Sequence, residues 1–551
     1  MAVLDVPEPL NLAALHEAIA AVVPDRECIV WRDRRLTWAD VTDRTRRLAA
    51  VLRAHGLEPP ADGATVEGWE SAQAHVALYL HNGNEYLEGM LGSFKARCAG
   101  VNINYRYVAE ELRYVLADSR AQAIVFHGEF APTLAEVLPD LPHLRLLLQV
   151  DDGSGHELLP GAIEYEAALA DARPSAPEGL SPDDLYILYT GGTTGLPKGV
   201  LWRQCDFLAA CLGIAQTTDQ LVDKARSSTL RVLAAPPFMH GAAHWNAISA
   251  WTTGGTVVIQ DVPSRLDPDD ILRTLARERA TSLLIVGDAF ARPLVDALRS
   301  GRHDVGPLRH LLTGGAVLSP PVKDELLALV PGLQIVDVLG SSETGRQGVQ
   351  MTRAGRGARA GSFAPSPTAV VLSEDRTRVL VPGDDELGWL AQTGRMPLGY
   401  LGDPDKSHRT FPVVDGIRYA VAGDRARWSS DGSIELHGRD SVTINTGGEK
   451  VFAEEVEQAL KHHPAVFDAV VVGRPSERWG QEVVAVVQLR PEAEPPTDDE
   501  LRAVAGEHVA RYKLPKAVIR VPIVERSPSG KPDYRWAAAV AMELGGSRGT
   551  P

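Results

Sequence analysis

A chain of 551 residues with 44% apolar residues is too long for one hydrophobic core, so two to four domains or subdomains are expected. The formal charge of −16 argues against a nucleic-acid partner, because nucleic-acid-binding domains carry a basic face. Neither a long apolar run nor a signal-peptide pattern is present, which predicts no transmembrane helix and no secretion. Cys28, Cys98, Cys205 and Cys211 form no CxxC pair, which fits a reducing cytoplasm and argues against zinc.

Helical and strand-like patterns alternate through the first third of the chain. Apolar residues at helical spacing predict helices, and short apolar runs predict buried strands. The predicted helices cover residues 10–23, 36–55 and 86–97, and the predicted strands cover 76–80, 123–126 and 146–150. This alternation predicts an α/β fold with mostly parallel sheets that helices cover on both faces.

A loop rich in glycine and threonine follows the apolar run Leu185-Tyr-Ile-Leu. It reads Tyr189-Thr-Gly-Gly-Thr-Thr-Gly-Leu-Pro-Lys198-Gly199. Glycines let backbone N–H groups converge on an anion, and hydroxyls and a lysine add donors and charge. The spacing fits neither a Walker loop nor a dinucleotide fingerprint, because Leu-Pro separates the last loop glycine from Lys198. A plain surface turn would need no threonine cluster with a lysine. The segment therefore predicts a phosphate-binding loop.

Four later segments place polar groups beside glycines. Thr313-Gly-Gly-Ala316 follows a strand-like run, and Val338-Leu-Gly-Ser-Ser-Glu343 puts a carboxylate in a turn after an apolar strand. Asp424 ends a short strand pattern, a common way to bind a ribose diol. Lys531 lies in a Gly-Lys turn near the C-terminus. Taken singly, a solvated glutamate explains Glu343 equally well, most lysines near a C-terminus are plain surface charges, and a single glycine pair is a weak signal.

The second half of the chain changes in texture. From about Val370 to His437 short strand patterns are broken by Gly, Pro and Asp, which predicts a β-rich subdomain. A compact α/β segment follows Arg439. We therefore expect a large domain over residues 1–439, a small mobile domain over 440–544, and a disordered tail over 545–551.

These motifs occur together and in one order, and in this the chain resembles the superfamily of acyl- and aryl-CoA synthetases, adenylation domains and luciferases. The resemblance runs from Leu36-Thr37-Trp38 to Lys531. It implies a large domain of mixed parallel-sheet subdomains with a β-rich subdomain, hinged to a small α+β domain. It also implies ATP, CoA and a carboxylic acid as substrates, and Mg²⁺ as a cofactor.

The resemblance also assigns site residues. It implies that Lys531, Glu343, His240 and Thr190 are catalytic, that Glu343 holds Mg²⁺, and that the hinge is at Ser441. The implied ATP and AMP site comprises Thr190, Gly191, Gly192, Thr193, Thr194, Gly195, Lys198, Gly314, Gly315, Ala316, Gly340, Ser341, Ser342, Glu343, Asp424 and Arg439. The implied CoA site comprises Gly447, Gly448, Glu449 and Trp479, and the candidates for the acyl pocket are Phe238, Met239, Trp245, Asp288 and Phe290.

Three positions differ from the commonest pattern of the superfamily: Leu339, Ser441 and Trp202-Arg203. A narrower group is similar in these features, together with Gly287-Asp-Ala-Phe-Ala-Arg-Pro293 and Gly530-Lys-Pro-Asp-Tyr-Arg-Trp536. This group comprises actinobacterial acyl-CoA synthetases that act on steroid side chains and other bulky isoprenoid acids.

The leading interpretation is an AMP-forming acid–thiol ligase, which activates a bulky or long-chain acid to acyl-AMP and then forms the CoA thioester. Two alternatives stay open. One is an adenylating enzyme that loads a carrier protein. The other is a ligase that only transfers a supplied acyl-adenylate to CoA, and the departures at Leu339 and Ser441 leave this alternative open. The sequence identifies neither the acid nor the oligomeric state, and a homodimer is one of the states it leaves open.

Overall fold

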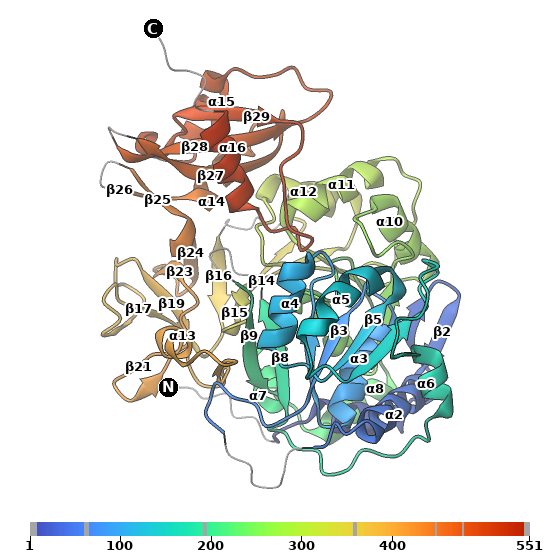
Figure 1. The fold of residues 1–551 in the computed structure, drawn as a ribbon. Helices are drawn as coiled ribbons and strands as arrows, with labels where there is room; N and C mark the ends of the chain where they lie inside the picture. Colours follow the sequence, from blue (N-terminus) through green and yellow to red (C-terminus); the bar gives the residue numbers. More distant parts are fainter. Residues whose placement is uncertain are drawn as a thin grey trace.

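The computed structural model describes residues 8–59, 66–190, 196–355, 361–446, 449–476 and 479–544. It has a large N-terminal part and a small C-terminal part that stands on one edge of it (Figure 1). The strands form a 14-stranded sheet, an 8-stranded sheet, a 5-stranded sheet and a two-stranded ribbon. No helix of the described residues combines the length and the apolar character needed to cross a bilayer.

The 14-stranded sheet changes character along its width. Its centre, from β1 through β11, β10, β12 and β13 to β14, is parallel, whereas the pairs beyond β14 are antiparallel. The strands of the first half are β1 (Glu27–Trp31), β2 (Arg34–Thr37), β10 (Arg231–Ala234), β11 (Thr256–Ile259), β12 (Ser282–Ile285), β13 (His310–Gly314) and β14 (Gln334–Ser341). Those of the second half are β15 (Gly345–Arg353), β16 (Ser362–Pro365), β17 (Ala369–Leu372), β18 (Val379–Leu380), β19 (Gly388–Gln392), β23 (Asp424–Trp428) and β24 (Ile434–Arg439).

The 8-stranded sheet has a parallel core that ends in the antiparallel pairs β8–β9 and β9–β20. Its strands are β3 (His75–Tyr79), β4 (Ala99–Asn102), β5 (Ala123–His127), β6 (Leu146–Val150), β7 (Ala162–Glu164), β8 (Leu185–Thr190), β9 (Lys198–Arg203) and β20 (Gly399–Tyr400). The prediction of parallel sheets is therefore correct for both sheet centres, and the β-rich region is antiparallel throughout. The ribbon is β21 (Val413–Val414) and β22 (Ile417–Arg418).

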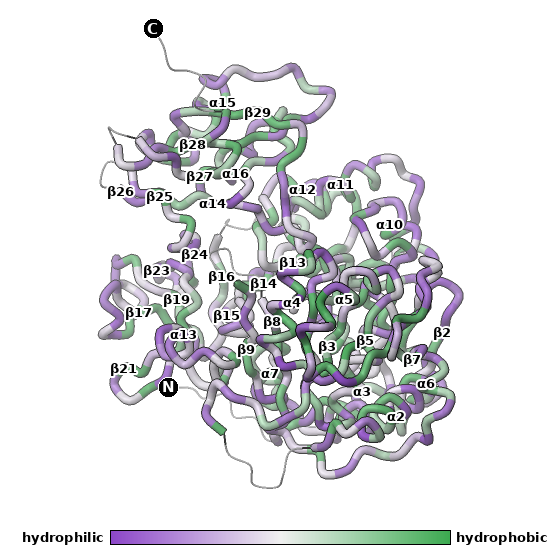
Figure 2. The backbone as a smooth tube through the Cα atoms, in the orientation of Figure 1, coloured by the Kyte–Doolittle hydropathy of each residue, from purple (hydrophilic) through white to green (hydrophobic). Residues whose placement is uncertain are grey.

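Helices pack beside the parallel centres of both large sheets (Figure 1), and green, apolar stretches are frequent along these strands (Figure 2). The helices of the large part are α1 (Leu12–Ala20), α2 (Trp38–Ala54), α3 (Asn84–Lys95), α4 (Ala109–Asp118), α5 (Ala131–Val137), α6 (Tyr165–Asp171), α7 (Gln204–Ala210), α8 (Thr218–Arg226), α9 (Gly241–Trp251), α10 (Pro268–Arg277), α11 (Gly287–Arg299), α12 (Pro320–Leu329) and α13 (Pro404–Thr410).

Two boundaries differ from the sequence prediction. Helix α2 begins at Trp38 rather than Leu36, because Leu36 and Thr37 pair with β1 and the Thr37 side chain caps the helix by accepting from Asp40 N. Asp424 begins strand β23 instead of ending a strand, since it pairs with Arg439 at the far end of β24.

The small part contains the 5-stranded sheet and three helices. Its strands are β25 (Thr443–Thr446), β26 (Glu449–Phe452), β27 (Val466–Ser476), β28 (Gly480–Leu489) and β29 (Ala517–Val521), and its helices are α14 (Ala453–Leu460), α15 (Asp498–Gly506) and α16 (Tyr534–Glu543). A single 3-10 turn, η3 (Asp440–Val442), connects it to β24 of the large sheet. The predicted tail lies outside the described residues.

Candidate active site

The predicted phosphate loop connects two paired strands. Thr190 ends β8 and Lys198 begins β9, and the two residues are partners across the antiparallel pair. Gly191, Gly192, Thr193, Thr194 and Gly195 lie outside the described residues. The Lys198 ammonium lies 3.1 Å from Asp403 Oδ2 at the start of α13. Burial opposes the charged form, but the contact with Asp403 raises the pKa of Lys198. Lys198 therefore carries a positive charge at the mouth of the loop.

The second glycine pair lies at the end of β13. A β-carbon on Gly314 would come within 2.8 Å of Val338 O, and Gly315 has a φ of +78°. The Cε atom of Lys531 lies 3.5 Å from the β-carbon position of Gly315. Gly315 thus lets the lysine of the small part approach the backbone of the large part closely.

The β14–β15 hairpin carries Glu343 in its turn. Its backbone is held from within, because Ser341 N donates to Thr344 Oγ1 (3.1 Å) and Glu343 N donates to Ser341 Oγ (3.3 Å). Ser342 O accepts from the Trp202 indole at 2.9 Å. Glu343 Oε1 accepts from the Tyr400 hydroxyl at 2.9 Å, so the carboxylate is oriented by strand β20 of the other sheet. Gly340 faces Gly345 O, which leaves no space for a side chain.

Asp424 and Arg439 face each other across β23 and β24. Arg439 Nε lies 3.2 Å from Asp424 Oδ1, and Asp424 is buried. The charge of Asp424 contributes most to raising the pKa of Arg439. Glu343 and Glu454 raise it further, whereas burial lowers it. The pair joins a carboxylate and a guanidinium at the point where the chain leaves the large part.

Lys531 is the residue that the small part brings to this region. Its loop is fastened by Arg526, which donates to Gly530 O at 2.8 Å and to Asp468 Oδ1 at 2.7 Å. The Lys531 side chain is exposed at the junction of the two parts, beside Gly315, and this junction is called the cleft below. Desolvation by the surrounding protein lowers the pKa of Lys531, and the Arg439 charge lowers it further, whereas Glu343 and Asp424 raise it. These residues therefore interact electrostatically around one cleft.

His240 precedes helix α9 in the same cleft. Burial lowers the pKa of His240 to about 3, with additional contributions from Lys531, His244 and Arg106. The imidazole is therefore neutral at physiological pH. Its Nε2 atom is buried and has no hydrogen-bond partner among the described residues. A neutral imidazole with a free nitrogen can contact a carboxylate or its ester oxygen without carrying charge.

A chain of hydrogen bonds lies behind His240. Trp245 Nε1 donates to the Tyr186 hydroxyl (2.7 Å), Tyr186 donates to His244 Nε2, and His244 Nδ1 donates to Phe238 O (2.6 Å). The carbonyl of Phe238 can only accept, so the direction of the whole chain is fixed. Burial lowers the pKa of His244 to about 4, which keeps the imidazole neutral. The chain holds Trp245 in one orientation.

Four of the five candidates for the acyl pocket are divided between two hydrophobic core clusters. Neighbouring residues of β10 and β12 belong alternately to two core clusters, so these clusters cover opposite faces of the sheet. Phe238 and Met239 belong to one cluster, with Trp245 packed on it, and Phe290 belongs to the other. Phe290 thus packs in the cluster on the opposite face of the sheet from Phe238 and Met239, and the assignment of Phe290 and Asp288 to the acyl pocket stays a prediction.

Phe290 contacts the lysine loop, and Asp288 contacts the start of helix α12. A β-carbon on Gly530 would lie 3.1 Å from Phe290 Cε2, so the Phe290 ring supports the lysine loop. Asp288 is buried, accepts from Ser319 N at 2.8 Å and lies 3.6 Å from Arg292, so its carboxylate caps helix α12.

The residues predicted to bind CoA belong to two segments of the small part, one at the start of β26 and one directly before β28. Gly447 and Gly448 are outside the described residues. Glu449 is exposed at the start of β26, and Trp479 is 38% exposed, with the Lys516 ammonium 6.0 Å from its ring centroid. Ser441 is exposed in the 3-10 turn that connects the two parts. Glu449 and Trp479 are thus accessible from solvent.

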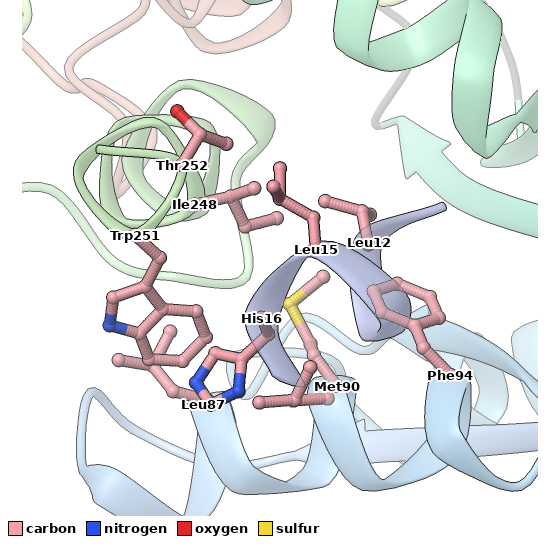
Figure 3. Close-up of a pocket in the computed structure, with 10 residues that line it drawn as sticks. Leu12, Leu15, His16, Leu87, Met90, Phe94, Ile248, Trp251 and Thr252 are labelled. Atoms are coloured by element: carbon pink, nitrogen blue, oxygen red, sulfur yellow. The ribbon is translucent and has the colours of Figure 1, made fainter. Parts of the chain in front are cut away.

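A small apolar pocket lies away from this cleft, between α1, α3 and α9 (Figure 3). His16 faces it, stacked on Trp38 at 4.7 Å, and Trp251 and Met90 lie across from it. The space inside is about 20 Å³, roughly enough for one water. It is too small for an acyl chain.

Sequence reasoning missed four residues that hold the site together: Tyr400, Asp403, Arg526 and Tyr186. Tyr400 and Asp403 lie within the β-rich region of the sequence, but their partners Glu343 and Lys198 are far away in the chain, a relationship that spacing does not show. The Asp468–Arg526 pair could have been suspected only from an isolated Asp beside a buried strand.

Two α/β sheets, a β-rich extension and a small part that brings a lysine to the cleft define the class of adenylate-forming enzymes. The model of the AMP-binding enzyme family matches residues 16–396, and that of the AMP-binding enzyme C-terminal domain matches residues 455–531. The chain belongs to the AMP-binding enzyme family.

Two curated relatives and one solved structure align with nearly the whole length of this chain. The medium-chain acyl-CoA ligase Mig of Mycobacterium avium is 50% identical, covering 98% of this chain and 99% of the relative. The 3-oxocholest-4-en-26-oate–CoA ligase of Rhodococcus rhodochrous is 39% identical, covering 96% and 95%. The fold is that of the anthranilate CoA ligase AuaEII in complex with anthranoyl-AMP, with a TM-score of 0.81, 22% identity and 98% of each chain covered.

Proposed function

We propose that the protein is an AMP-forming acid–CoA ligase. The observation that carries this proposal is the position of Lys531, next to Gly315 and within electrostatic reach of Glu343, Asp424 and Arg439. The two relatives described above, which cover nearly the whole chain, carry names of CoA ligases.

The first half-reaction needs charge neutralisation more than covalent help. An acid carboxylate attacks the α-phosphate of ATP, pyrophosphate leaves, and a mixed anhydride forms. Lys531 would stabilise the developing charge between the acid and the α-phosphate, and Lys198 would neutralise the leaving phosphates. Asp424 would accept hydrogen bonds from the ribose hydroxyls.

Glu343 is the residue proposed to hold Mg²⁺. It fits, because magnesium is typically bound through one or two carboxylates together with substrate phosphates. The Tyr400 hydroxyl occupies Oε1 of Glu343 and orients the group. When bound, the ion supplies charge neutralisation at the phosphates.

In the second half-reaction the thiol of CoA attacks the acyl carbon and AMP leaves. Lys531 occupies the cleft in the arrangement seen here, so we propose that the small part rotates about Ser441 and presents the region of Glu449 and Trp479 instead. The boundary between the two domains would then fall at residue 440.

The acid is proposed to be apolar and of medium length or bulkier. The two relatives are named for medium-chain acids and for a steroid acid. Phe238, Met239 and Trp245 supply an apolar wall beside His240. Each buried methylene would contribute about 0.8 kcal/mol to binding.

A pyrophosphate-release assay tests the proposal. Decanoate, palmitate and 3-oxocholest-4-en-26-oate would each be supplied with ATP, with and without CoA. We expect AMP, pyrophosphate and a CoA thioester with at least one acid. Release of acyl-AMP without any thioester would favour a carrier-loading enzyme, and thioester formation only from supplied acyl-AMP would favour a transfer-only ligase.

A further inference from the structure

Arg346 is a half-buried cation without a counter-ion among the described residues. It lies on β15, three residues after Glu343 and opposite Gly340 on β14. In the part of the chain that the structure describes, its guanidinium makes neither a hydrogen bond nor an ion pair. Arg353, on the same strand, donates to Gln334 Oε1 at 2.9 Å. Arg346 therefore differs from an ordinary arginine of this sheet.

The chain makes room for this side chain. The Arg346 Nη2 atom lies 1.9 Å from the position that a β-carbon would take on Gly213, so any other residue at 213 would displace the guanidinium. Gly213 also has a φ of +70°, which favours glycine. The nearby Cys211 cannot serve as the anion, because burial raises the pKa of its thiol far above neutrality.

Arg346 lies against the segment that follows α7. A β-carbon on Gly213 would meet its guanidinium, and a β-carbon on the neighbouring Gly345 would lie 3.2 Å from Cys211 Sγ. Cys211 follows Phe207 by one helical turn, and the Phe207 ring lies 5.6 Å from that of Trp245. Arg346 and Trp245 thus both lie next to residues of α7 or its C-terminal cap, on the side of the proposed acyl wall.

We propose that Arg346 is a specificity-determining residue that binds an oxygen atom of the acid remote from the reacting carboxylate. This rests on the proposed function and refines it. The substrate class is an acid whose apolar body ends in a carbonyl or carboxylate oxygen. A guanidinium donates two parallel N–H groups to such oxygens and binds carboxylates most strongly.

The energetics favour a ligand role over a structural one. A partly desolvated charge with no partner destabilises the fold. A residue that only stabilised the protein would be paired, as Arg353 is. Replacing Arg346 with an apolar side chain of similar length should therefore leave the melting temperature unchanged or raise it.

The test compares matched acids with the wild type, Arg346→Met, Arg346→Lys and the control Arg353→Met. One series pairs monocarboxylates with dicarboxylates of six to twelve carbons, and a second pairs 3-oxocholest-4-en-26-oate with its 3-deoxy analogue. We expect the wild type to have the higher kcat/KM for the oxygenated acid in one of the two series. If that series is the dicarboxylates, the preference should be largest at one chain length. Arg346→Met should lower that preference about ten- to a hundredfold. Arg346→Lys should retain part of it, and Arg353→Met should retain all of it.

Each outcome bears on a different statement. An equal loss of kcat/KM for both members of every pair, with a lower Tm, would overturn the proposal and make Arg346 structural. A wild type without any preference for oxygenated acids would also overturn it. Failure of the wild type to form a CoA thioester from any acid would count against the proposed function, which is measured before the ratio.

Discussion

Gly530 lies against the ring of Phe290, with only 3.1 Å between Cε2 and the position of an added β-carbon. Val286 O lies 3.2 Å from the same point, and Gly530 has a φ of +76°. The loop that carries Lys531 thus fits the large domain only because residue 530 has no side chain.

Gly530→Ala should therefore impair docking of the lysine loop. The added methyl meets Phe290 and the backbone is strained. We expect acyl-AMP formation to fall about tenfold, roughly 1.4 kcal/mol, while thioester formation from supplied acyl-AMP is retained. Gly506→Ala is the matched control, since its β-carbon would make only an ordinary contact with Leu514, 3.7 Å away. Equal losses in both half-reactions would contradict a docking role.

Lys531→Ala tests the charge itself. Loss of one preorganised cation should slow acyl-AMP formation by about two to three orders of magnitude. The transfer of a supplied acyl-AMP to CoA should survive, because the lysine has then left the cleft. Both half-reactions are measured separately by quenched flow. An unaffected first step would instead support the transfer-only alternative.

Ser441→Pro tests the hinge. Proline fixes φ near about −65°, a value that suits the 3-10 turn seen here, and it resists the change that rotation requires. We expect adenylation to remain measurable while CoA transfer collapses. Normal overall turnover in the proline variant would place the pivot at another residue.

We expect Glu454 to make the stability of the docked arrangement, in which Lys531 lies beside Gly315, depend on pH. Arg439 N donates to Glu454 Oε1 at 3.4 Å. Burial and the charge of Glu457 raise the pKa of Glu454, hydrogen bonds and the charge of Arg439 lower it, and the net pKa is about 8. An exposed glutamate titrates near about 4.3. Between about pH 4 and pH 8, Glu454 therefore holds a proton in the docked arrangement that it loses when the two parts separate and expose it. The stability of the docked arrangement consequently falls as the pH rises from about 4, and the loss is complete above about 8.

The measurement is the ratio of the adenylation rates of wild type and Glu454→Gln across this range. The glutamine stays neutral, so the ratio should fall with rising pH and level off above about pH 8. Parallel profiles for the two proteins would show that Glu454 does not titrate with docking.

The sequence predicts what is local and misses what is brought together by the two sheets. The strand before Lys198, the turn of Glu343 and the glycines at 314 and 315 follow from short-range patterns and lie where expected. The separation of Phe238 and Phe290 into clusters on opposite faces of the sheet could not be predicted, because an apolar residue on a helix does not reveal which face of the sheet it covers. Arg346 carries no local signal, since its unusual feature is a missing partner.

The single turn Asp440–Val442 has a consequence for how the lysine reaches its target. In the described chain the small domain is joined to the large one by this turn alone, so Lys531 acts as a tethered reagent. A short tether supplies an effective concentration of about millimolar. Severing the chain at this turn would make adenylation depend on the concentration of the separated domain, and activity would return only as that concentration approached the value that the tether provides.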